Sequence, residues 1–496
     1  MKILSIRSGM SLAAACLVCL LARASAVALN DGKMRRPPMG WNSWNHFACQ
    51  NITETLFKQM ADAMVSSGMK DAGYTYLNID DCWIGARDAN GYISTNDFFT
   101  NKGLKTLADY VHGKGLKLGL YTSAGAQTCQ QYPGSLGYEE KDIERYAGWG
   151  VDYLKVDWCG INQEQNTNPL GAYARYRDAM IKYQNVNPMA LSVCCWGQYN
   201  VWLWGNQVGH LWRTTPDISL GWTSFADIID KQVTLWQYAG PGGWNDPDIL
   251  EVGRGMSVEE DKSHFGMWCL LAAPLLAGND LRNMNAATLQ ILTNSELIAV
   301  DQDSLGMQAQ RVVKNGDLEV WARPLAGNSR AVGLFNRSAS AQTMTVSWSD
   351  LDKWSAKGLL WPATKSVTVL NMWTHADAAT GRTGSYSVSV PSHGLAALRL
   401  YDPSNPVINR AIAGNADGIE LNARSIRFTG SGQHAYQVLG LNGAVLSSNK
   451  GSGIRSYSLS TCDYHGACIV RARTESGNSL CTVAFPNDLF AAGCFP

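Results

Sequence analysis

A repeated alternation of strand and helix patterns is the feature of this sequence that most restricts its fold. Short apolar runs rich in β-branched and aromatic residues are separated by stretches with helical spacing, such as 54–72, 103–113 and 138–149. Strands that alternate with helices predict a parallel sheet. About eight such units over roughly 270 residues match a (β/α)8 barrel in size, although the pattern does not establish that the barrel closes. The expected strands lie within 38–49, 74–83, 116–121, 151–159, 189–194, 208–213, 234–239 and 267–277.

The secondary-structure pattern of the sequence changes at about residue 310. Short alternating segments follow one another, separated by Gly, Asn, Ser or Pro, and helical spacing disappears. This pattern predicts an antiparallel β-sandwich over 310–402. After a Pro-containing linker, 407–496 again reads as short strands, with a hairpin signal at Asn442-Gly443. We therefore expect a barrel over 30–309, the sandwich, and a small all-β C-terminal domain of unknown role.

The first residues have the pattern of a secretory signal peptide. Basic Lys2 and Arg7 precede an apolar run over 10–22, and Ala24-Ser25-Ala26 provides small residues for cleavage. The apolar run is too short for a membrane-spanning helix. We expect 1–26 to be a signal peptide and the mature protein to be secreted, or held in the periplasm or at the cell surface, without a membrane anchor.

The charge balance gives no sign of a nucleic-acid partner. Lys and Arg together number 41, as do Asp and Glu, so no basic excess is present to attract a polyanion. The chain also carries 18 Trp and 19 Tyr. Flat aromatic rings suit the apolar faces of sugars, but Trp also fills cores, so this composition alone decides little.

The number of cysteines indicates that the protein works in an oxidising compartment, and their spacing matches no metal-binding motif. Of the 13 cysteines, Cys16 and Cys19 fall in the signal peptide and leave 11, so at least one thiol is free or paired between chains. Cys462, His465 and Cys468 offer three ligands at a spacing that matches no common zinc motif. We predict no metal site.

Aspartates with Trp neighbours gather where several expected strands end. The carboxyl ends of the strands are where a (β/α)8 barrel places its active site. Lys155 and Asp157 lie two residues apart on one strand, so their side chains face the same pocket. One strand-end acid is an ordinary ion pair, but several acids with aromatic rings are what a glycosidase needs. The aspartates are Asp80, Asp81, Asp157, Asp217, Asp246 and Asp248.

Five motifs surround these residues: Met39-Gly-Trp-Asn-Ser-Trp44, Ile79-Asp-Asp-Cys-Trp83, Tyr153-Leu-Lys-Val-Asp-Trp-Cys159, Trp212-Arg-Thr-Thr-Pro-Asp217-Ile218 and Gly242-Gly-Trp-Asn-Asp-Pro-Asp248. Together they resemble glycoside hydrolase family 27, the secreted α-galactosidases. The resemblance covers about 35–402 and implies a (β/α)8 barrel followed by a β-sandwich, and hydrolysis of terminal α-linked D-galactose with retention. It implies no cofactor.

By this resemblance Asp157 is the nucleophile and Asp217 the general acid and base. We expect Lys155 to lower the pKa of Asp157 and so keep it ionised. Asp217 should be the more desolvated of the two acids. Arg213 would oppose its protonation on contact, so we expect Arg213 to bind a sugar hydroxyl instead. A retaining pair has carboxyls roughly 5–5.5 Å apart, against about 6.5–9.5 Å for inversion.

The resemblance also implies the substrate contacts. Asp80 and Asp81 match the pair that accepts hydrogen bonds from the 4-hydroxyl and 6-hydroxyl of galactose. Relatives that act on β-L-arabinopyranosides alter this pair. The further positions that match substrate contacts are Trp44, Tyr121, Lys155, Cys195, Trp196, Arg213 and Asp248.

Two disulfides are implied in the same way, Cys49 with Cys82 and Cys129 with Cys159. The chain departs from the family at Cys194-Cys195-Trp196-Gly197, where plant-like members have Glu at the position of Cys195. That position lies near the 2-substituent of the sugar, so we expect a smaller neutral side chain there either to loosen selectivity at C2 or to weaken binding. No partners are assigned to the cysteines outside the two disulfides, which include Cys194, Cys195, Cys269 and the four of the C-terminal region.

Three alternatives to an α-galactosidase remain at this point. The same fold could carry a β-L-arabinopyranosidase or an α-N-acetylgalactosaminidase, or it could be a sugar-binding protein without catalysis. The expected substrate is a galactose-containing oligosaccharide or galactomannan. Its chain length, the oligomeric state and the role of 407–496 are left open by the sequence.

Overall fold

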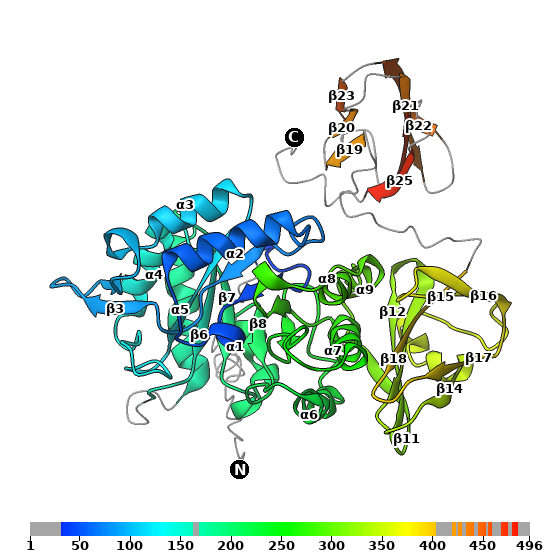
Figure 1. The fold of residues 1–496 in the computed structure, drawn as a ribbon, viewed down its shortest axis with the longest axis horizontal. Coiled ribbons are helices and arrows are strands. Elements are labelled where there is room, and N and C mark those ends of the chain that lie inside the picture. Colours follow the sequence, from blue (N-terminus) through cyan, green and yellow to red (C-terminus); the bar gives the residue numbers. More distant parts are fainter. Residues whose placement is uncertain are drawn as a thin grey trace, which may run out of the picture.

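The computed structural model describes residues 31–161 and 168–402, together with seven strands between 419 and 484 (Figure 1). The expected signal peptide, 1–26, lies outside these residues, as does most of the expected linker. No helix within the described ranges is both long enough and apolar enough to span a bilayer.

Eight parallel strands form the first sheet, which confirms the expected α/β barrel. Leu250, just after the last strand, donates its N–H to the Leu276 carbonyl at 2.8 Å and accepts from the N–H of Gly278 at 3.1 Å. These bonds close the ring that the strand pattern left open. In sheet order the strands are β10 (Leu275–Ala277), β1 (Met39–Asn42), β2 (Tyr76–Asn78), β5 (Lys117–Ser123), β6 (Tyr153–Asp157), β7 (Ala190–Cys194), β8 (Leu211–Arg213) and β9 (Trp244–Asp246).

Helices connect these strands and cover the sheet (Figure 1). Local signals fix their ends. Thr53 accepts from the N–H of Leu56 at the start of α2, and Ser257 with Glu260 makes a capping box at the start of α7. Gly150 ends α4 with a left-handed φ of 85°. The helices are the one-turn α1 (Trp44–Phe47), α2 (Glu54–Ser66), α3 (Lys105–Gly113), α4 (Glu139–Trp149), α5 (Pro169–Tyr183), α6 (Trp222–Gln232), α7 (Val258–Leu271), α8 (Ala286–Leu292) and α9 (Ser295–Asp301).

One expected strand was wrong, and another was expected over too long a range. Residues 234–239 form turns after α6, and the strand is β9, a few residues later. Residues 267–271 of the candidate 267–277 belong to α7, and its last three residues form β10. The C-terminal half of α7 is buried on all sides, so it lacks the amphipathic spacing that identifies a surface helix.

The second part of the chain is an antiparallel β-sandwich, as expected. A six-stranded sheet with the order β11-β12-β13-β18-β15-β16 faces the two-stranded sheet β14-β17. Trp348, Trp354 and Trp361 fill the space between them. The strands are β11 (Gln310–Asn315), β12 (Leu318–Leu325), β13 (Ser329–Asn336), β14 (Gln342–Ser347), β15 (Val367–Asn371), β16 (Ala376–Arg382), β17 (Ser385–Val390) and β18 (Leu395–Tyr401).

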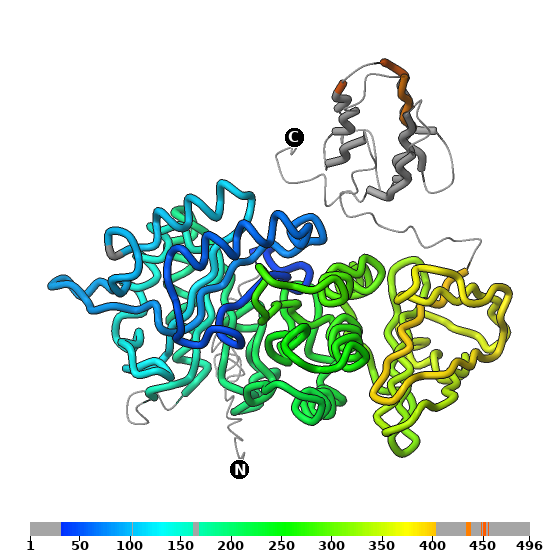
Figure 2. Tube along the Cα trace, in the orientation of Figure 1, coloured from blue at the N-terminus to red at the C-terminus, as the bar shows by residue number. Residues whose placement is uncertain are grey.

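The sandwich packs directly against the barrel at α6 and α7. Figure 2 shows the chain passing from the green barrel helices into the adjoining sandwich, and residues 302–309 connect α9 to the first sandwich strand. His393 stacks on Trp222 with ring centroids 3.9 Å apart, and its Nδ1 lies 2.9 Å from an oxygen of Glu260. The side chain of Ser263 donates to the His393 carbonyl. The sandwich therefore buttresses the helices that follow β8 and β9.

The C-terminal region contains only strands among its described residues, as the sequence predicts. β21 and β22 pair antiparallel on either side of 441–444, which agrees with the expected hairpin there. The two sheets have the orders β19-β20-β23 and β22-β21-β24-β25. The strands are β19 (Ile419–Asn422), β20 (Ser425–Phe428), β21 (Gln433–Gly440), β22 (Val445–Ser452), β23 (Arg455–Ser458), β24 (Cys468–Thr474) and β25 (Ser479–Ala484).

Candidate active site

A cavity of about 300 Å³ opens at the carboxyl ends of the barrel strands. Nine of the eleven side chains that the sequence assigns to chemistry or substrate binding line it together, although they are spread over some 200 positions of the chain. Both candidate catalytic acids are among them. These nine are Trp44, Asp80, Asp81, Tyr121, Lys155, Asp157, Arg213, Asp217 and Asp248.

Lys155 and Asp80 form a buried ion pair at the floor of the cavity. The ammonium nitrogen lies 2.9 Å from Asp80 Oδ2, and the side chain of Asn42 donates to the same oxygen at 2.8 Å. Burial would lower the pKa of Lys155, but its neighbours, Asp80 first, hold it well above its usual value. Lys155 is therefore a fixed positive charge beside the proposed nucleophile.

Asp157 ends strand β6 and is almost fully buried, with 5% of its surface exposed. Its Oδ1 accepts the N–H of Trp158 at 2.8 Å. Burial raises the pKa of Asp157 to about 6, and Lys155 only partly opposes this. The expected lowering of the pKa was therefore wrong, because desolvation outweighs the nearby cation. A carboxyl with this pKa is still roughly nine-tenths ionised at pH 7.

Arg213 bridges two acids on the other side of the cavity. Its Nη2 lies 2.9 Å from Asp217 Oδ1 and 2.7 Å from Asp248 Oδ2. The expectation that Arg213 would leave Asp217 free was wrong. Burial works to raise the pKa of Asp217, but Arg213 outweighs it and holds the pKa below the usual value. The Asp217 side chain is 69% exposed, so it is also less desolvated than Asp157, contrary to expectation.

Asp248 holds the loop that carries Asp217. Its Oδ2 accepts the N–H of Ile218 at 2.8 Å, and its own N–H donates to Asp246 at 2.8 Å. Its φ of 94° is unusual for a residue with a side chain. Backbone strain of this kind persists only where surrounding contacts impose it. Asp248 therefore ties the loops after β8 and β9 into one unit.

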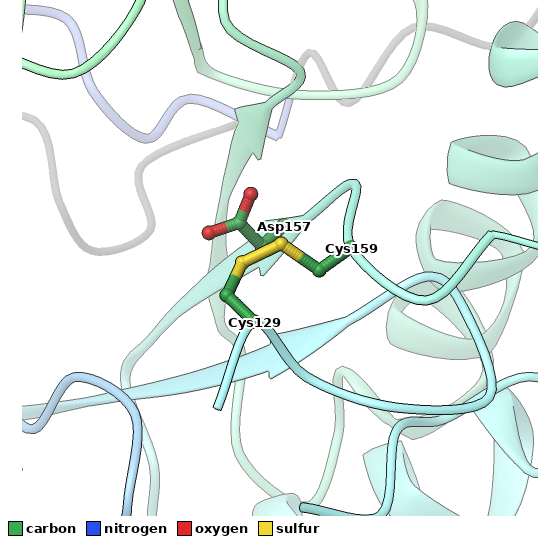
Figure 3. A group of neighbouring side chains, drawn as sticks. All are labelled: Cys129, Asp157 and Cys159. Carbon is green, nitrogen blue, oxygen red and sulfur yellow. A yellow bond between two sulfur atoms is a disulfide. The ribbon is translucent and has the colours of Figure 1, made fainter. Parts of the chain in front are cut away.

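A disulfide lies against the carboxylate of Asp157 (Figure 3). Cys129 and Cys159 are bonded, and their sulfurs and an Asp157 oxygen lie within 4.8 Å of one another. Because both thiols are used in the bond, this group offers no metal site. Cys49 and Cys82 form the second disulfide, so the structure makes both pairs that the resemblance implies.

We expect the Cys129–Cys159 disulfide to stabilise the fold. It closes a loop with a sequence separation of 30. Replacing both cysteines with serine should lower the free energy of unfolding by about 3 kcal/mol, since the unfolded chain gains the freedom of the opened loop. Urea unfolding of the double variant and the oxidised wild type measures this. Equal midpoints and slopes for the two proteins would contradict it.

Cys195 and Trp196 are the two predicted contacts that do not line the cavity. Cys195 is fully buried, and its thiol contacts the carbonyl of Gln198 at 3.7 Å. Burial raises the pKa of Cys195 to about 12, so the thiol stays neutral. Trp196 is half-buried and has a positive φ of 55°. A role for either at the 2-substituent of a sugar stays a prediction.

Sequence reasoning missed several residues in and beside the cavity. Asn42, the last residue of β1, holds Asp80; it falls within the Met39–Trp44 motif but was assigned no role. Glu251 and Arg254 line the cavity, three and six residues after Asp248. They follow a strand end in sequence, but neither falls within the motifs that carry the resemblance.

Comparison with known proteins decides the family. The model of a family described as "Alpha galactosidase A" matches residues 36–303, and that of the "Alpha galactosidase C-terminal beta sandwich domain" matches 315–400. The chain belongs to the family 27 α-galactosidases. It is 45% identical over 413 residues to "Alpha-galactosidase A" of Cellvibrio japonicus, covering 79% of this chain and 98% of that protein. It is 46% identical to "Alpha-galactosidase" of Cyamopsis tetragonoloba, covering 75% and 87%.

Solved α-galactosidase structures have the same architecture. α-Galactosidase I from Mortierella vinacea superposes with a TM-score of 0.71 at 35% identity, covering 76% of this chain and all of that one. The Saccharomyces cerevisiae enzyme solved with raffinose gives a TM-score of 0.67 at 29% identity, covering 74% and 98%. A β-L-arabinopyranosidase from Geobacillus stearothermophilus is 22% identical with a TM-score of 0.65, so it supports the fold alone.

Proposed function

We propose that this chain is a retaining exo-α-galactosidase that removes terminal α-linked D-galactose from oligosaccharides or galactomannan. The observation that carries the proposal is the convergence of Asp157 and Asp217, from β6 and from the loop after β8, on one cavity of a family 27 barrel. A pair of carboxyls flanking one glycosidic bond is the minimum that glycoside hydrolysis needs.

The reaction has two steps. A carboxylate oxygen of Asp157 attacks the anomeric carbon while the bond to the leaving oxygen breaks, and Asp217 gives its proton to that oxygen. Asp217, now ionised, takes a proton from water, whose oxygen attacks the anomeric carbon and displaces Asp157. The galactose leaves with its α configuration retained. These steps use only the two side chains and water.

Galactose would be recognised by acceptors buried at the floor of the cavity. Asp80 and Asp81 are 2% and 1% exposed. Asp80 is held by Lys155 and Asn42, and Asp81 accepts the N–H of Cys82 at 2.7 Å and that of Gln130 at 3.1 Å. An epimer with a misplaced hydroxyl would leave such acceptors unpaired, so a fixed pair of this kind discriminates strongly.

A panel of 4-nitrophenyl glycosides tests the activity. We expect the α-D-galactoside to have the highest kcat/KM, with the β-L-arabinopyranoside, α-N-acetylgalactosaminide and α-D-glucoside on the order of 100-fold lower. The arabinopyranoside lacks the 6-hydroxyl, and the glucoside presents the 4-hydroxyl in the wrong direction. A faster β-L-arabinopyranoside or N-acetylgalactosaminide would replace the proposed substrate. Binding of galactose without turnover of any glycoside would indicate a non-catalytic sugar-binding protein.

The pKa values of the two acids predict an acidic optimum. The active form needs ionised Asp157 and protonated Asp217, that is, one proton on the pair. The pKa of Asp157 is about 6 and that of Asp217 lies below its usual value, so the pair carries one proton only between these two pKa values and loses it above about pH 6. We expect kcat/KM for the nitrophenyl galactoside to fall about tenfold per pH unit above that value. A profile that is flat from pH 6 to pH 8 would contradict this.

We also propose that the protein is exported and works outside the cytoplasm. Residues 1–26 have the pattern of a signal peptide, and the two disulfides of the barrel fit an oxidising compartment. Its partner is then an extracellular or periplasmic galactose-containing saccharide, with neither nucleic acid nor membrane required. The proposed division is a barrel over 30–309, a sandwich over 310–402 and a β-rich domain over 407–496.

A further inference from the structure

An arginine buried inside the sandwich has no paired carboxylate to balance its charge. Arg330, near the start of β13, is fully buried and forms no ion pair with any residue that the structure describes. Burial lowers the pKa of Arg330 to about 10, and Asp352 opposes this only in part. Asp352 Oδ1 instead accepts the backbone N–H of Trp361 at 2.8 Å. A buried charge of this kind is unfavourable unless an opposite charge accompanies it.

Only part of the guanidinium is hydrogen-bonded. Its Nη1 donates to the Ser329 carbonyl at 3.1 Å, and its Nη2 donates to the Leu359 carbonyl at 2.6 Å. The Nε atom of Arg330 is buried and has no acceptor within the described part of the chain. Two neutral carbonyls hold the guanidinium in place, but they leave its Nε–H and its charge unmatched.

Two tryptophans pack around the same guanidinium. The central carbon of Arg330 lies 4.6 Å from the ring centre of Trp361 and 5.6 Å from that of Trp354. A cation is attracted to the face of an indole ring, whereas the indole N–H lies in the ring plane. Both Nε1 atoms are buried without an acceptor among the described residues. One group of side chains therefore contains three buried N–H donors without acceptors, which is rare in folded proteins.

Lys365 brings a second positive charge to this group. Its Nζ lies 4.7 Å from the ring centre of Trp361. Burial lowers the pKa of Lys365, Asp402 opposes this, and the nearby charge of Arg330 lowers the pKa further. Trp354 and Trp361 are at most 2% exposed, whereas Lys365 is only half-buried. Lys365 therefore connects the buried donors with the solvent.

A small anion suits these donors better than water or an oxyanion does. A water molecule has two lone pairs, so it can accept from only two of the three N–H groups, and it brings no charge. Sulfate or phosphate would bury four oxygens against three donors and leave oxygen atoms unpaired. Chloride accepts several N–H bonds at once and neutralises the guanidinium.

We propose that Arg330, Trp354 and Trp361 bind one chloride ion inside the sandwich, with Lys365 at its entrance. The ion would link strand β13 to the segment between β14 and β15, which carries both tryptophans. Chloride would then be a structural ligand that fastens this segment to the sheet. None of these four residues lines the active-site cavity, so the inference is independent of the proposed reaction.

Thermal unfolding of the full chain tests the site. Chloride is raised from 1 to 300 mM while potassium gluconate keeps the ionic strength constant. We expect the wild-type midpoint to rise by about 3 °C, because a ligand that binds only the folded state stabilises it. In Trp354→Phe, which removes the N–H but keeps an aromatic ring, the shift should fall below half of the wild-type shift, and likewise in Arg330→Met.

Each variant has a matched control. Trp348→Phe removes another buried indole N–H of the same core, one that donates to the Lys365 carbonyl. Arg382→Met removes an exposed arginine of the same sandwich. Both controls should keep the wild-type shift. Where Arg330→Met does not fold, Trp354→Phe decides the matter. A wild-type midpoint that does not respond to chloride, or a shift in Trp354→Phe of at least half the wild-type value, overturns the proposal.

Bromide locates the ion directly. Crystals of the full chain grown in potassium bromide should give an anomalous difference peak within hydrogen-bonding distance of Arg330 Nε. Bromide has the charge of chloride, nearly its size, and strong anomalous scattering. Peaks that lie only elsewhere on the molecule, or no peak at all, would show that these donors do not bind a halide.

Discussion

Replacing Asp157 with asparagine should abolish hydrolysis of α-galactosides and at the same time stabilise the fold near neutral pH. Turnover should fall by a factor on the order of 10⁴ or more, because an amide cannot form the glycosyl ester. The amide oxygen of the new side chain can still accept the N–H of Trp158, as Asp157 Oδ1 does, so the strand end keeps its geometry. Initial rates with the nitrophenyl galactoside measure the loss.

The stability gain follows from the raised pKa of Asp157. Burial raises this pKa from 3.8 to about 6 in the folded protein, so folding favours the protonated carboxyl. Its stabilising contribution is complete below about pH 4 and is lost as the pH rises through 6, whereas asparagine stays neutral. At pH 7 the variant should be more stable by about 3 kcal/mol, and the difference should vanish near pH 4.

Thermal or urea unfolding of both proteins at pH 4 and pH 7 measures this difference. Asp71→Asn is the matched control, because Asp71 is exposed and its replacement should change stability little at either pH. A variant that is less stable than wild type at pH 7, or one that keeps substantial turnover, would contradict the role of Asp157 as a buried, ionised nucleophile.

Replacing Asp217 with alanine should produce a loss that depends on the leaving group. Melibiose needs a proton at its glycosidic oxygen, so its kcat/KM should fall about 10³- to 10⁴-fold. 2,4-Dinitrophenyl α-galactoside releases a stable phenolate and should lose far less in the first step. Added azide should then restore turnover of the activated substrate by attacking the glycosyl ester in place of water, giving α-galactosyl azide.

Steady-state kinetics on both substrates, with and without azide, give this result directly. Asp227→Asn is the matched control, since Asp227 is exposed on α6 and lies outside the cavity lining. Equal losses on the two substrates would contradict the acid role of Asp217. A large loss on the activated substrate that azide does not relieve would indicate that Asp217 only binds galactose.

The sequence predicted the fold where periodicity is strong and failed where it is weak. Strands β5, β6 and β7 have at least five residues each and were identifiable from their apolar runs. β9 and β10 have three residues each, too few for a period, and their neighbours at 234–239 and in α7 supplied misleading apolar runs. Closure through Leu250 depends on two backbone bonds that no residue pattern encodes.

The positions of the site residues were predictable from the sequence, whereas their protonation states were not. Acids at strand ends were predictable, because the barrel brings the carboxyl ends of its strands to one face. The pKa values of these acids were not predictable, because they depend on the depth of burial and on which cation lies closest. Burial raises the pKa of Asp157 by more than Lys155 lowers it, and Arg213 contacts Asp217. Neither the depth of burial nor the nearest cation can be read from residue spacing.

Peptide mapping of a trapped glycosyl-enzyme identifies the nucleophile without reference to rates. A fluorine-substituted α-galactosyl fluoride, which forms the ester quickly and hydrolyses it slowly, is incubated with the protein before digestion and mass spectrometry. We expect a single added glycosyl group, attached to Asp157 at the end of strand β6. A label on any other carboxylate would contradict the assignment of Asp157 as the nucleophile. Hydrolysis of the reagent without any labelled peptide would contradict a covalent intermediate.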